Sequence, residues 1–221
     1  MAISLKQKAY TIIKSKILNC EYPPSMFLNE EILCNEINAS RTPIRDALVR
    51  LEQENLVTIL PKKGIIVSSL TISEINAIYE TRILLEPYIL LNYGARITED
   101  ILKRMKDSIT RMDLDKESLS NEAISDLYVI DDEYHKLLIG LCNNKYLIQC
   151  HDHIYAQNYR LRIMSGNQIP ERLIASKNEH LKIHNYIIQE NYIKASEALK
   201  EHLLASKEAA FKVIINSTFP V

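Results

Sequence analysis

The stretch NASRTPIRDALVRLEQENL, residues 38–56, decides the fold of the first third of this 221-residue chain. Apolar residues recur in it at the i, i+3, i+4, i+7 spacing of a helix that buries one face. They are Ile44, Ala47, Leu48 and Leu51. Ser40 is a good helix cap, and Pro43 falls in the first turn, where its missing N–H costs little. Because Asn38 and Asn55 tolerate a left-handed backbone, the stretch predicts one helix between two turns.

Two further helices are predicted before this one. Residues 4–19 repeat apolar side chains with a helical period, and Pro23 and Pro24 end that helix. Its inward positions are Leu5, Ala9, Ile12, Ile13 and Ile17. A second helix begins after Asn29, whose side chain can cap it. Its inward positions are Ile32, Leu33 and Ile37.

Two β-rich runs follow the third helix, LVTIL at residues 56–60 and GIIVSS at residues 64–69. They predict a hairpin. Its tip carries Lys62, Lys63 and Gly64, which would let it approach a DNA backbone or minor groove closely. Helix, helix, short turn, helix and basic-tipped hairpin is the order of a winged helix-turn-helix, so residues 1–70 are expected to form a DNA-binding domain.

The basic residues of the third helix fit that role. A recognition helix reads DNA with its first turns, because that end enters the major groove. Arg41, Thr42 and Arg45 lie there, and a guanidinium can bond a guanine edge bidentately. Considered alone, three arginines among acidic residues are more often a solvated helix face. The net charge of −1 decides nothing either, so the preceding helix, the turn and the wing carry the interpretation.

Residues 28–70, LNEEILCNEINASRTPIRDALVRLEQENLVTILPKKGIIVSSL, resemble the DNA-binding domain of the GntR family of bacterial transcription regulators, and the similarity begins at residue 5. The resemblance implies base and phosphate contacts by Arg41 and Arg45. It implies supporting backbone contacts by Ser40, Thr42 and Arg50, and a wing tip at Lys63-Gly64. The sequence departs from the family at three turns. Asn38 and Asn55 stand where Gly is usual, and Ser25 stands where a Pro-Gly turn is usual.

Residues 71–221 are a succession of helical patterns, without alternating β patterns, a phosphate loop or a nucleophile elbow. The predicted helices span 73–95, 98–116, 120–142, 145–165, 168–190 and 193–216. The sequence therefore predicts a mainly α protein, in which an all-α antiparallel helical bundle follows the winged helix.

Composition limits the class of protein. No window approaches the roughly 20 apolar residues of a membrane helix, and the first residues lack the apolar core of a signal peptide. The four cysteines show no C-x-x-C spacing, so they are interpreted as reduced thiols. We therefore expect a cytoplasmic protein with no membrane partner.

The histidines carry the chemistry of the bundle. Asp131 and His135 are four residues apart and share a helix face. His180 and His202 lie at similar distances on either side of the QENY turn, so an antiparallel helix pair brings them level. One carboxylate and three imidazoles would form a divalent-metal site with open coordination positions, suited to Zn, Ni, Mn or Fe. His184, four residues after His180, competes for the fourth ligand position.

A single histidine is more often a satisfied or exposed residue than a ligand. His151 and His153 serve as controls, because two residues apart on a helix they face different sides, which is poor geometry for a shared metal.

Three segments resemble the ligand-sensing FCD domain of the FadR-type branch of the GntR family. They are YETRILLEPYILLNYGA at 79–95, NEHLKIHNYI at 178–187 and EALKEHL at 197–203, together with the spacing of Asp131 and His135. The resemblance covers residues 72–216. It implies metal ligands at Asp131, His135, His180 and His202, and a small organic acid held at the metal. By position, Arg82 would face the effector pocket or an ion network with Glu86.

These observations predict a ligand-responsive transcription regulator rather than an enzyme, with repression as the favoured sign. A homodimer is expected, because paired recognition helices about 34 Å apart read a palindromic operator in double-stranded DNA. Two alternatives stay open. The sensor could bind its effector without metal, or the cluster could activate water in a metallohydrolase with an accessory DNA-binding domain. The sequence identifies neither the acid, the metal nor the operator.

Overall fold

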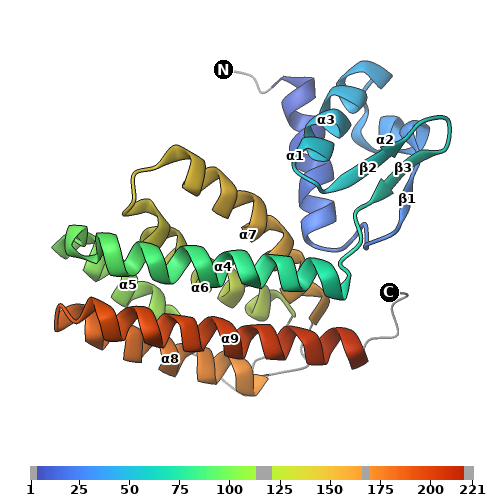
Figure 1. Ribbon diagram of the computed structural model, residues 1–221. Coiled ribbons are helices and arrows are strands. Elements are labelled where there is room, and N and C mark those ends of the chain that lie inside the picture. The colour runs from blue at the N-terminus through green and yellow to red at the C-terminus, as the bar shows by residue number, and fades with distance from the viewer. Residues whose placement is uncertain (1–3, 113–120, 166–169, 217–221) are drawn as a thin grey trace. The chain divides into compact units, whose positions relative to one another are not determined.

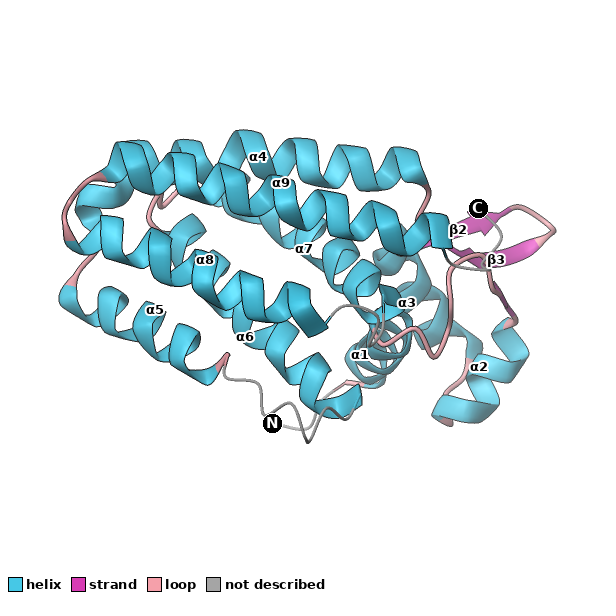
Figure 2. Ribbon diagram, turned by 90° about the horizontal axis from the view of Figure 1, so that it is seen from below, coloured by secondary structure: helices cyan, strands magenta, loops and turns pink. Residues whose placement is uncertain are grey.

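The computed structural model describes residues 4–112, 121–165 and 170–216. In these ranges it contains nine α-helices, one short 3-10 helix and one three-stranded sheet (Figure 1, Figure 2). The predicted fold class, mainly α with an N-terminal winged helix-turn-helix and a C-terminal helical bundle, is confirmed. None of the described helices has the length and apolar character that a membrane span requires.

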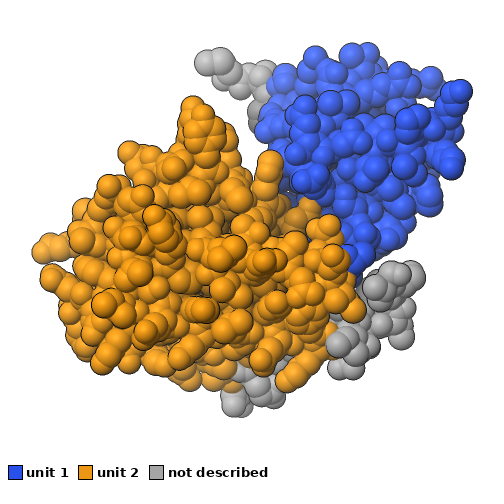
Figure 3. Space-filling view, viewed as in Figure 1, with its two compact units in different colours: residues 1–71, 159–164, 221 blue, residues 72–158, 165–220 orange. Residues whose placement is uncertain are grey.

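The described residues group into two compact units (Figure 3). The first holds the residues up to Thr71 together with Tyr159–Met164 of a later helix, and the second holds the remainder.

The first unit contains three helices and an antiparallel sheet. Its elements are α1 (Leu5–Leu18), β1 (Phe27–Leu28), α2 (Glu30–Ile37), α3 (Arg41–Gln53), β2 (Val57–Leu60) and β3 (Gly64–Val67). β3 lies between β1 and β2. The sequence did not predict β1, because two residues are too few to show an alternating pattern. Phe27 and Leu28 pair with Ile66 and Ile65 of β3.

Asparagine fixes the turn between α2 and α3. Asn38 has φ 54° and ψ 55°, in the left-handed region that asparagine tolerates better than most residues. Asn29 caps α2 as predicted, since its side chain accepts a hydrogen bond from the Glu31 N–H at 2.8 Å. Ser40 occupies the N-cap position of α3, but its side chain makes no capping hydrogen bond, so the predicted side-chain cap is wrong.

The other two departures from the family pattern also lie at left-handed positions. Ser25 has φ 65° and Asn55 has φ 57°. The three turns therefore keep a left-handed backbone although none of them contains glycine at these positions.

Apolar packing in the first unit follows the predicted faces with two exceptions. The face of α3 formed by residues 44, 47, 48 and 51 is buried as predicted. Leu5 is 55% exposed, because it precedes Ala9, the first buried position of α1. Ile32 is 63% exposed, because it lies roughly 100° around α2 from the buried Leu33. Both were predicted to point inward, and both predictions are wrong.

The remaining elements are helices. They are α4 (Ile72–Tyr93), η1 (Gly94–Arg96), α5 (Glu99–Arg111), α6 (Asn121–Gly140), α7 (Lys145–Ser165), α8 (Pro170–Ile188) and α9 (Tyr192–Asn216). α4 and α9 lie side by side, α8 runs along α9, and α5 packs with α6 (Figure 1, Figure 2). The predicted helix boundaries at residues 116, 120 and 168 fall outside the described residues.

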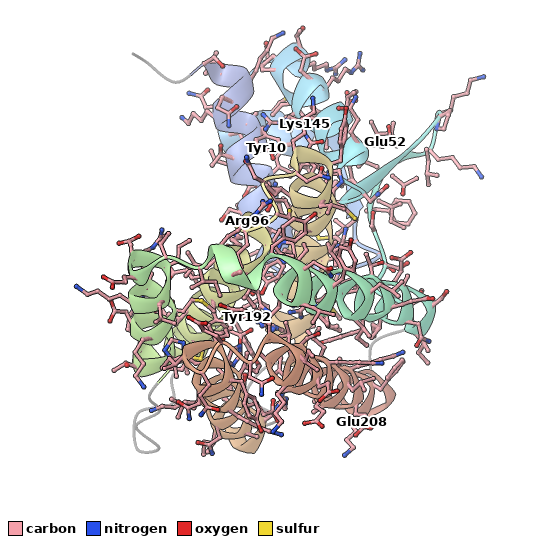
Figure 4. All side chains as sticks on the ribbon, turned by 60° about the vertical axis from the view of Figure 1, so that its left-hand side comes forward. Tyr10, Glu52, Arg96, Lys145, Tyr192 and Glu208 are labelled. Atoms are coloured by element: carbon pink, nitrogen blue, oxygen red, sulfur yellow. The ribbon has the colours of Figure 1, made fainter. Side chains whose placement is uncertain are left out.

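One apolar core holds this bundle together, with buried side chains from α4, α5, α6, α8 and α9. The start of α9 packs closely on η1. A Cβ added at Gly94 would lie 2.4 Å from Cδ1 of Tyr192, which is labelled in Figure 4. A side chain at position 94, the first residue of η1, would therefore require the Tyr192 ring at the start of α9 to move.

Candidate functional sites

The first turns of α3 present the residues predicted to read DNA. Arg41, Thr42 and Arg45 are all exposed. Arg45 does not project into solvent alone, because its Nε lies 3.0 Å from each carboxylate oxygen of Glu30 at the start of α2. Glu30 is part-buried and raises the pKa of the Arg45 guanidinium by accepting these hydrogen bonds. The two helices of the helix-turn-helix are thus joined through the main predicted base-reading residue.

Arg50 lies five residues after Arg45 on α3 and contacts α1. Its guanidinium carbon is 3.6 Å from the ring centroid of Tyr10, which Figure 4 labels. Its Nη1 donates a hydrogen bond to Gln7 Oε1 at 3.1 Å. The predicted DNA-backbone contact of Arg50 would compete with these interactions. Ser40 is exposed at the N-cap of α3.

The predicted wing tip lies between β2 and β3. Lys62 and Lys63 are exposed, and the Lys63 N–H donates to the Leu60 carbonyl at 3.0 Å. Lys62 has φ 63° and Gly64 has φ 112°, so the tip makes a tight left-handed turn. Two unburied ammonium groups at a narrow tip are suited to phosphate contacts.

The four predicted metal ligands meet inside the bundle. Asp131 and His135 come from α6, His180 from α8 and His202 from α9, and all four are buried. Their nearest ligand atoms all lie within 4.8 Å of one another. His135 Nε2 is 3.3 Å from His180 Nε2, and the two carboxylate oxygens of Asp131 are 3.5 and 3.7 Å from these imidazole nitrogens. The spacing in the sequence thus corresponds to a convergence of donors in space.

Each imidazole of the cluster is supported at its other nitrogen. His135 Nδ1 is 2.6 Å from Glu86 Oε2, and His202 Nδ1 is 2.7 Å from Glu179 Oε2. His180 Nδ1 is 2.8 Å from the Ser176 carbonyl of its own helix. An acceptor at Nδ1 favours the tautomer with its hydrogen there and leaves the Nε2 lone pair available to a metal.

Burial keeps two histidines of the cluster neutral, and the arginines and histidines beside Glu86 and Glu179 keep these two carboxyl groups ionised. Burial lowers the pKa of His135, and burial lowers that of His202 to about 4, so both rings are neutral at pH 7. Burial would raise the pKa of Glu86, but Arg82 and His135 hold it well below its usual range. Burial likewise opposes ionisation of Glu179, yet His202 and Arg172 lower its pKa to about 2.

The donor set fits a divalent metal ion. Three imidazoles and one carboxylate are ligands that first-row metals and zinc accept. His202 Nε2 is buried and has no hydrogen-bond partner among the described residues. A bound cation would explain why this buried nitrogen lacks a hydrogen-bond partner, since it lies among three other possible metal ligands.

The other histidines of the bundle lie outside the cluster. His184, the predicted competitor for the fourth position, is buried but is not brought together with the other donors. His153 is exposed and His151 is buried, so the two face different sides of α7 as predicted. His151 packs on Tyr155 at a ring-centroid distance of 4.4 Å.

Arg82, the predicted effector contact, is buried on α4. Its Nε donates to Glu86 Oε1 at 2.6 Å, so it belongs to the ion network that supports His135. Sequence reasoning missed Glu179 and Arg172, the corresponding pair at His202. Two signals could have indicated them. Arg172 and Glu179 are seven residues apart, so they share a helix face, and the turn that brings His180 level with His202 also brings the adjacent Glu179 close to His202.

Comparison with known proteins agrees with this architecture. Residues 5–67 match the bacterial regulatory proteins of the gntR family, and residues 77–205 match the FCD domain. The HTH-type transcriptional repressor RspR of Escherichia coli (strain K12) is 22% identical over 211 residues, which cover 95% of this chain and 90% of RspR.

Two solved structures extend the comparison. A transcriptional regulator GntR from Rhodococcus sp. RHA1 has a TM-score of 0.75 at 18% identity, covering 96% of this chain and 98% of that one. The Zn²⁺-bound FCD domain of the transcriptional regulator TM0439 has a TM-score of 0.50 at 27% identity, covering 67% of this chain and 97% of that one. The chain therefore belongs to the GntR family of bacterial transcription regulators, in the branch whose winged helix-turn-helix is followed by an FCD domain.

Proposed function

We propose that this protein is a homodimeric repressor that binds a palindromic operator in double-stranded DNA in the cytoplasm. The first unit reads the operator, and the FCD domain binds a divalent metal ion and a small organic acid. Effector binding changes operator affinity, which requires the acid to bind the two states of the repressor differently. The observation that carries the sensing role is the buried cluster of Asp131, His135, His180 and His202.

The metal would supply open coordination positions to which a carboxylate or hydroxycarboxylate can bind. Zn²⁺ is the first metal to test, because the similar FCD domain of TM0439 binds it. Ni, Mn and Fe are the other metals that the donor set suits. Arg82 would add a positive charge next to the site for the carboxylate of the acid.

The surroundings of the cluster favour sensing over hydrolysis. Many hydrolytic metal sites place a carboxylate beside the metal as a general base. Glu86 and Glu179 are each bound to both a histidine and an arginine, so their carboxylates are engaged. The named relatives are transcriptional regulators, which supports a protein that is not an enzyme.

The metal assignment is tested by elemental analysis of the dialysed full-length protein. His180→Ala and His202→Ala should each lose most of the bound metal. His184→Ala is the matched control, because His184 is buried one turn after His180 yet lies outside the cluster. Wild-type metal content in both His180→Ala and His202→Ala would remove the metal assignment.

The effector is tested by thermal shift with organic acids, with and without a chelator. An acid that binds through the metal should raise the unfolding temperature of the metal-loaded protein only, because a ligand stabilises the form that it binds. An acid that stabilises the two forms equally would support the alternative of a metal-free effector pocket.

DNA recognition is tested on an operator selected from random duplex DNA with the wild-type protein. Arg45→Ala should weaken operator binding by roughly 1–3 kcal/mol, because it removes a predicted bidentate base contact. Arg111→Ala is a matched control, since Arg111 is a similarly exposed, Glu-paired arginine outside the first unit. Wild-type affinity of Arg45→Ala for the selected operator would contradict the recognition-helix assignment.

A further inference from the structure

A part-buried ion pair between Arg172 and Glu179 contacts His202 at the ring nitrogen Nδ1. The two terminal nitrogens of the Arg172 guanidinium donate hydrogen bonds to Glu179, with Nη1–Oε1 at 2.8 Å and Nη2–Oε2 at 2.7 Å. The same Oε2 lies 2.7 Å from His202 Nδ1. We propose that Glu179, held in place by Arg172, is a positioning residue that fixes the tautomer and orientation of His202 for metal binding. This inference rests on the proposed metal site.

The hydrogen-bond pattern determines the tautomer. A carboxylate can only accept and a guanidinium can only donate, so the hydrogen shared by Glu179 and His202 belongs to Nδ1. Arg172 Nη2 is farther from Nδ1, at 3.3 Å, and its stronger contacts go to the carboxylate. With the hydrogen at Nδ1, Nε2 carries the lone pair, and this buried atom has no hydrogen-bond partner among the described residues.

Arg172 also joins the two helices that carry His180 and His202. From α8 its Nη2 donates to Ser206 Oγ at 2.8 Å on α9. It also approaches the His202 carbonyl at 3.4 Å. Arg172 and Glu179 together therefore contact both the main chain and the ring of His202. An ion pair on the surface that contacted neither would not restrain this histidine.

The three imidazoles differ in how this support can be tested. The Glu86–Arg82 pair behind His135 is fully buried, so removing one member leaves a buried charge and endangers the fold. The support of His180 is a main-chain carbonyl. Glu179 and Arg172 are 28% and 17% exposed, so their substitution separates metal binding from folding.

The experiment measures Zn²⁺ affinity of the full-length protein by competition with a chromophoric chelator. Glu179→Gln should lower the affinity about 10- to 100-fold, the usual effect of losing such an outer partner. Glu201→Gln is the matched control, because Glu201 is adjacent to His202 on α9 but pairs with Lys182. The visible absorption of the Co²⁺-loaded protein should change in Glu179→Gln and stay unchanged in Glu201→Gln, since it reports ligand arrangement.

The outcomes separate the two levels of the proposal. A wild-type protein that binds neither Zn²⁺ nor Co²⁺ would remove the metal site itself. Wild-type binding together with unchanged affinity and spectrum in Glu179→Gln would overturn only the positioning role. If Glu179→Gln does not fold, Arg172→Gln replaces it. That variant leaves the carboxylate in place but unanchored, so a smaller loss of affinity in the same direction is expected, and no loss would overturn the proposal.

Discussion

At the scale of single residues, the buried histidines differ in what surrounds their ring nitrogens. Those of the cluster have acceptors at Nδ1, whereas neither nitrogen of His151 has a hydrogen-bond partner among the described residues. His151 packs on Tyr155 with the two rings tilted by 32°, and the ionisable groups that act on it are Glu86, Arg82, His135 and Lys136. Burial is the largest influence and lowers its pKa to about 3.

This burial predicts a pH-dependent stability. The folded pKa of His151 lies below its ordinary value of 6.5, so the unfolded chain binds the proton first as the pH falls. Stability is therefore lost from about pH 6.5 downward, and His151 should account for about 2 kcal/mol at pH 5. His135 and His202 add changes of the same sign.

The measurement is urea unfolding of the metal-free protein at pH 7 and pH 5. His151→Phe keeps an aromatic ring against Tyr155 but cannot bind a proton, so its free energy of unfolding should fall less between the two pH values. An equal fall in the variant and the wild type would show that His151 is not buried as a neutral ring.

Contacts between residues close in the sequence could be predicted, whereas contacts that depend on helix packing could not. Asp131 and His135 could be paired from helical spacing alone, and His180 with His202 from their distances to a turn. Glu179, Arg172 and the burial of His151 were not predicted, because each depends on which helix packs across from it. The spacing of apolar residues shows which face of a helix is buried, but not which helix packs against that face.

At the scale of elements, the turns are the most sequence-determined parts of the first unit. Asn38 and Asn55 were expected to be left-handed and are, with φ 54° and 57°. β1 was missed, and Leu5 and Ile32 were placed inside wrongly. Short strands and helix ends carry few residues for a pattern to show, so tertiary packing decides them.

Asn38 supports a prediction about the helix-turn-helix itself. Asn38→Val should lower the free energy of unfolding by about 1–2 kcal/mol, because a β-branched residue pays the steric cost of the left-handed backbone. Asn38→Gly should be nearly neutral. Asn35→Val, at an exposed helical position of α2, controls for the loss of an asparagine in urea unfolding. Equal losses in Asn38→Val and Asn35→Val would contradict the role of the turn.

At the scale of the whole molecule, the proposed dimer needs a surface. α4 exposes Leu84, Tyr88 and Leu91, which are 69%, 54% and 45% accessible. Their i, i+4, i+7 spacing places them on one stripe, and an exposed apolar stripe marks an interaction site. A second copy of the chain would cover it with its own stripe under two-fold symmetry.

The prediction is that Leu84→Lys combined with Tyr88→Lys converts the dimer to a monomer in analytical ultracentrifugation. Operator affinity should fall with it, because each monomer reads only one half-site. Tyr146→Lys is the control, since Tyr146 is 70% exposed and belongs to a different helix, α7. A dimer that persists in the double variant would place the interface elsewhere.

The support of His180 sets a limit on how the proposed metal site can diverge. His135 and His202 each have a glutamate carboxylate at Nδ1, so a single substitution of that glutamate would weaken the support and lower the proposed affinity for a metal ion. His180 rests on the Ser176 carbonyl, which every amino acid carries. Mutation can therefore remove the side-chain acceptor at two corners of the proposed site. At the third corner it can remove only the Ser176 hydroxyl, 3.3 Å from His180 Nδ1, and not the carbonyl acceptor.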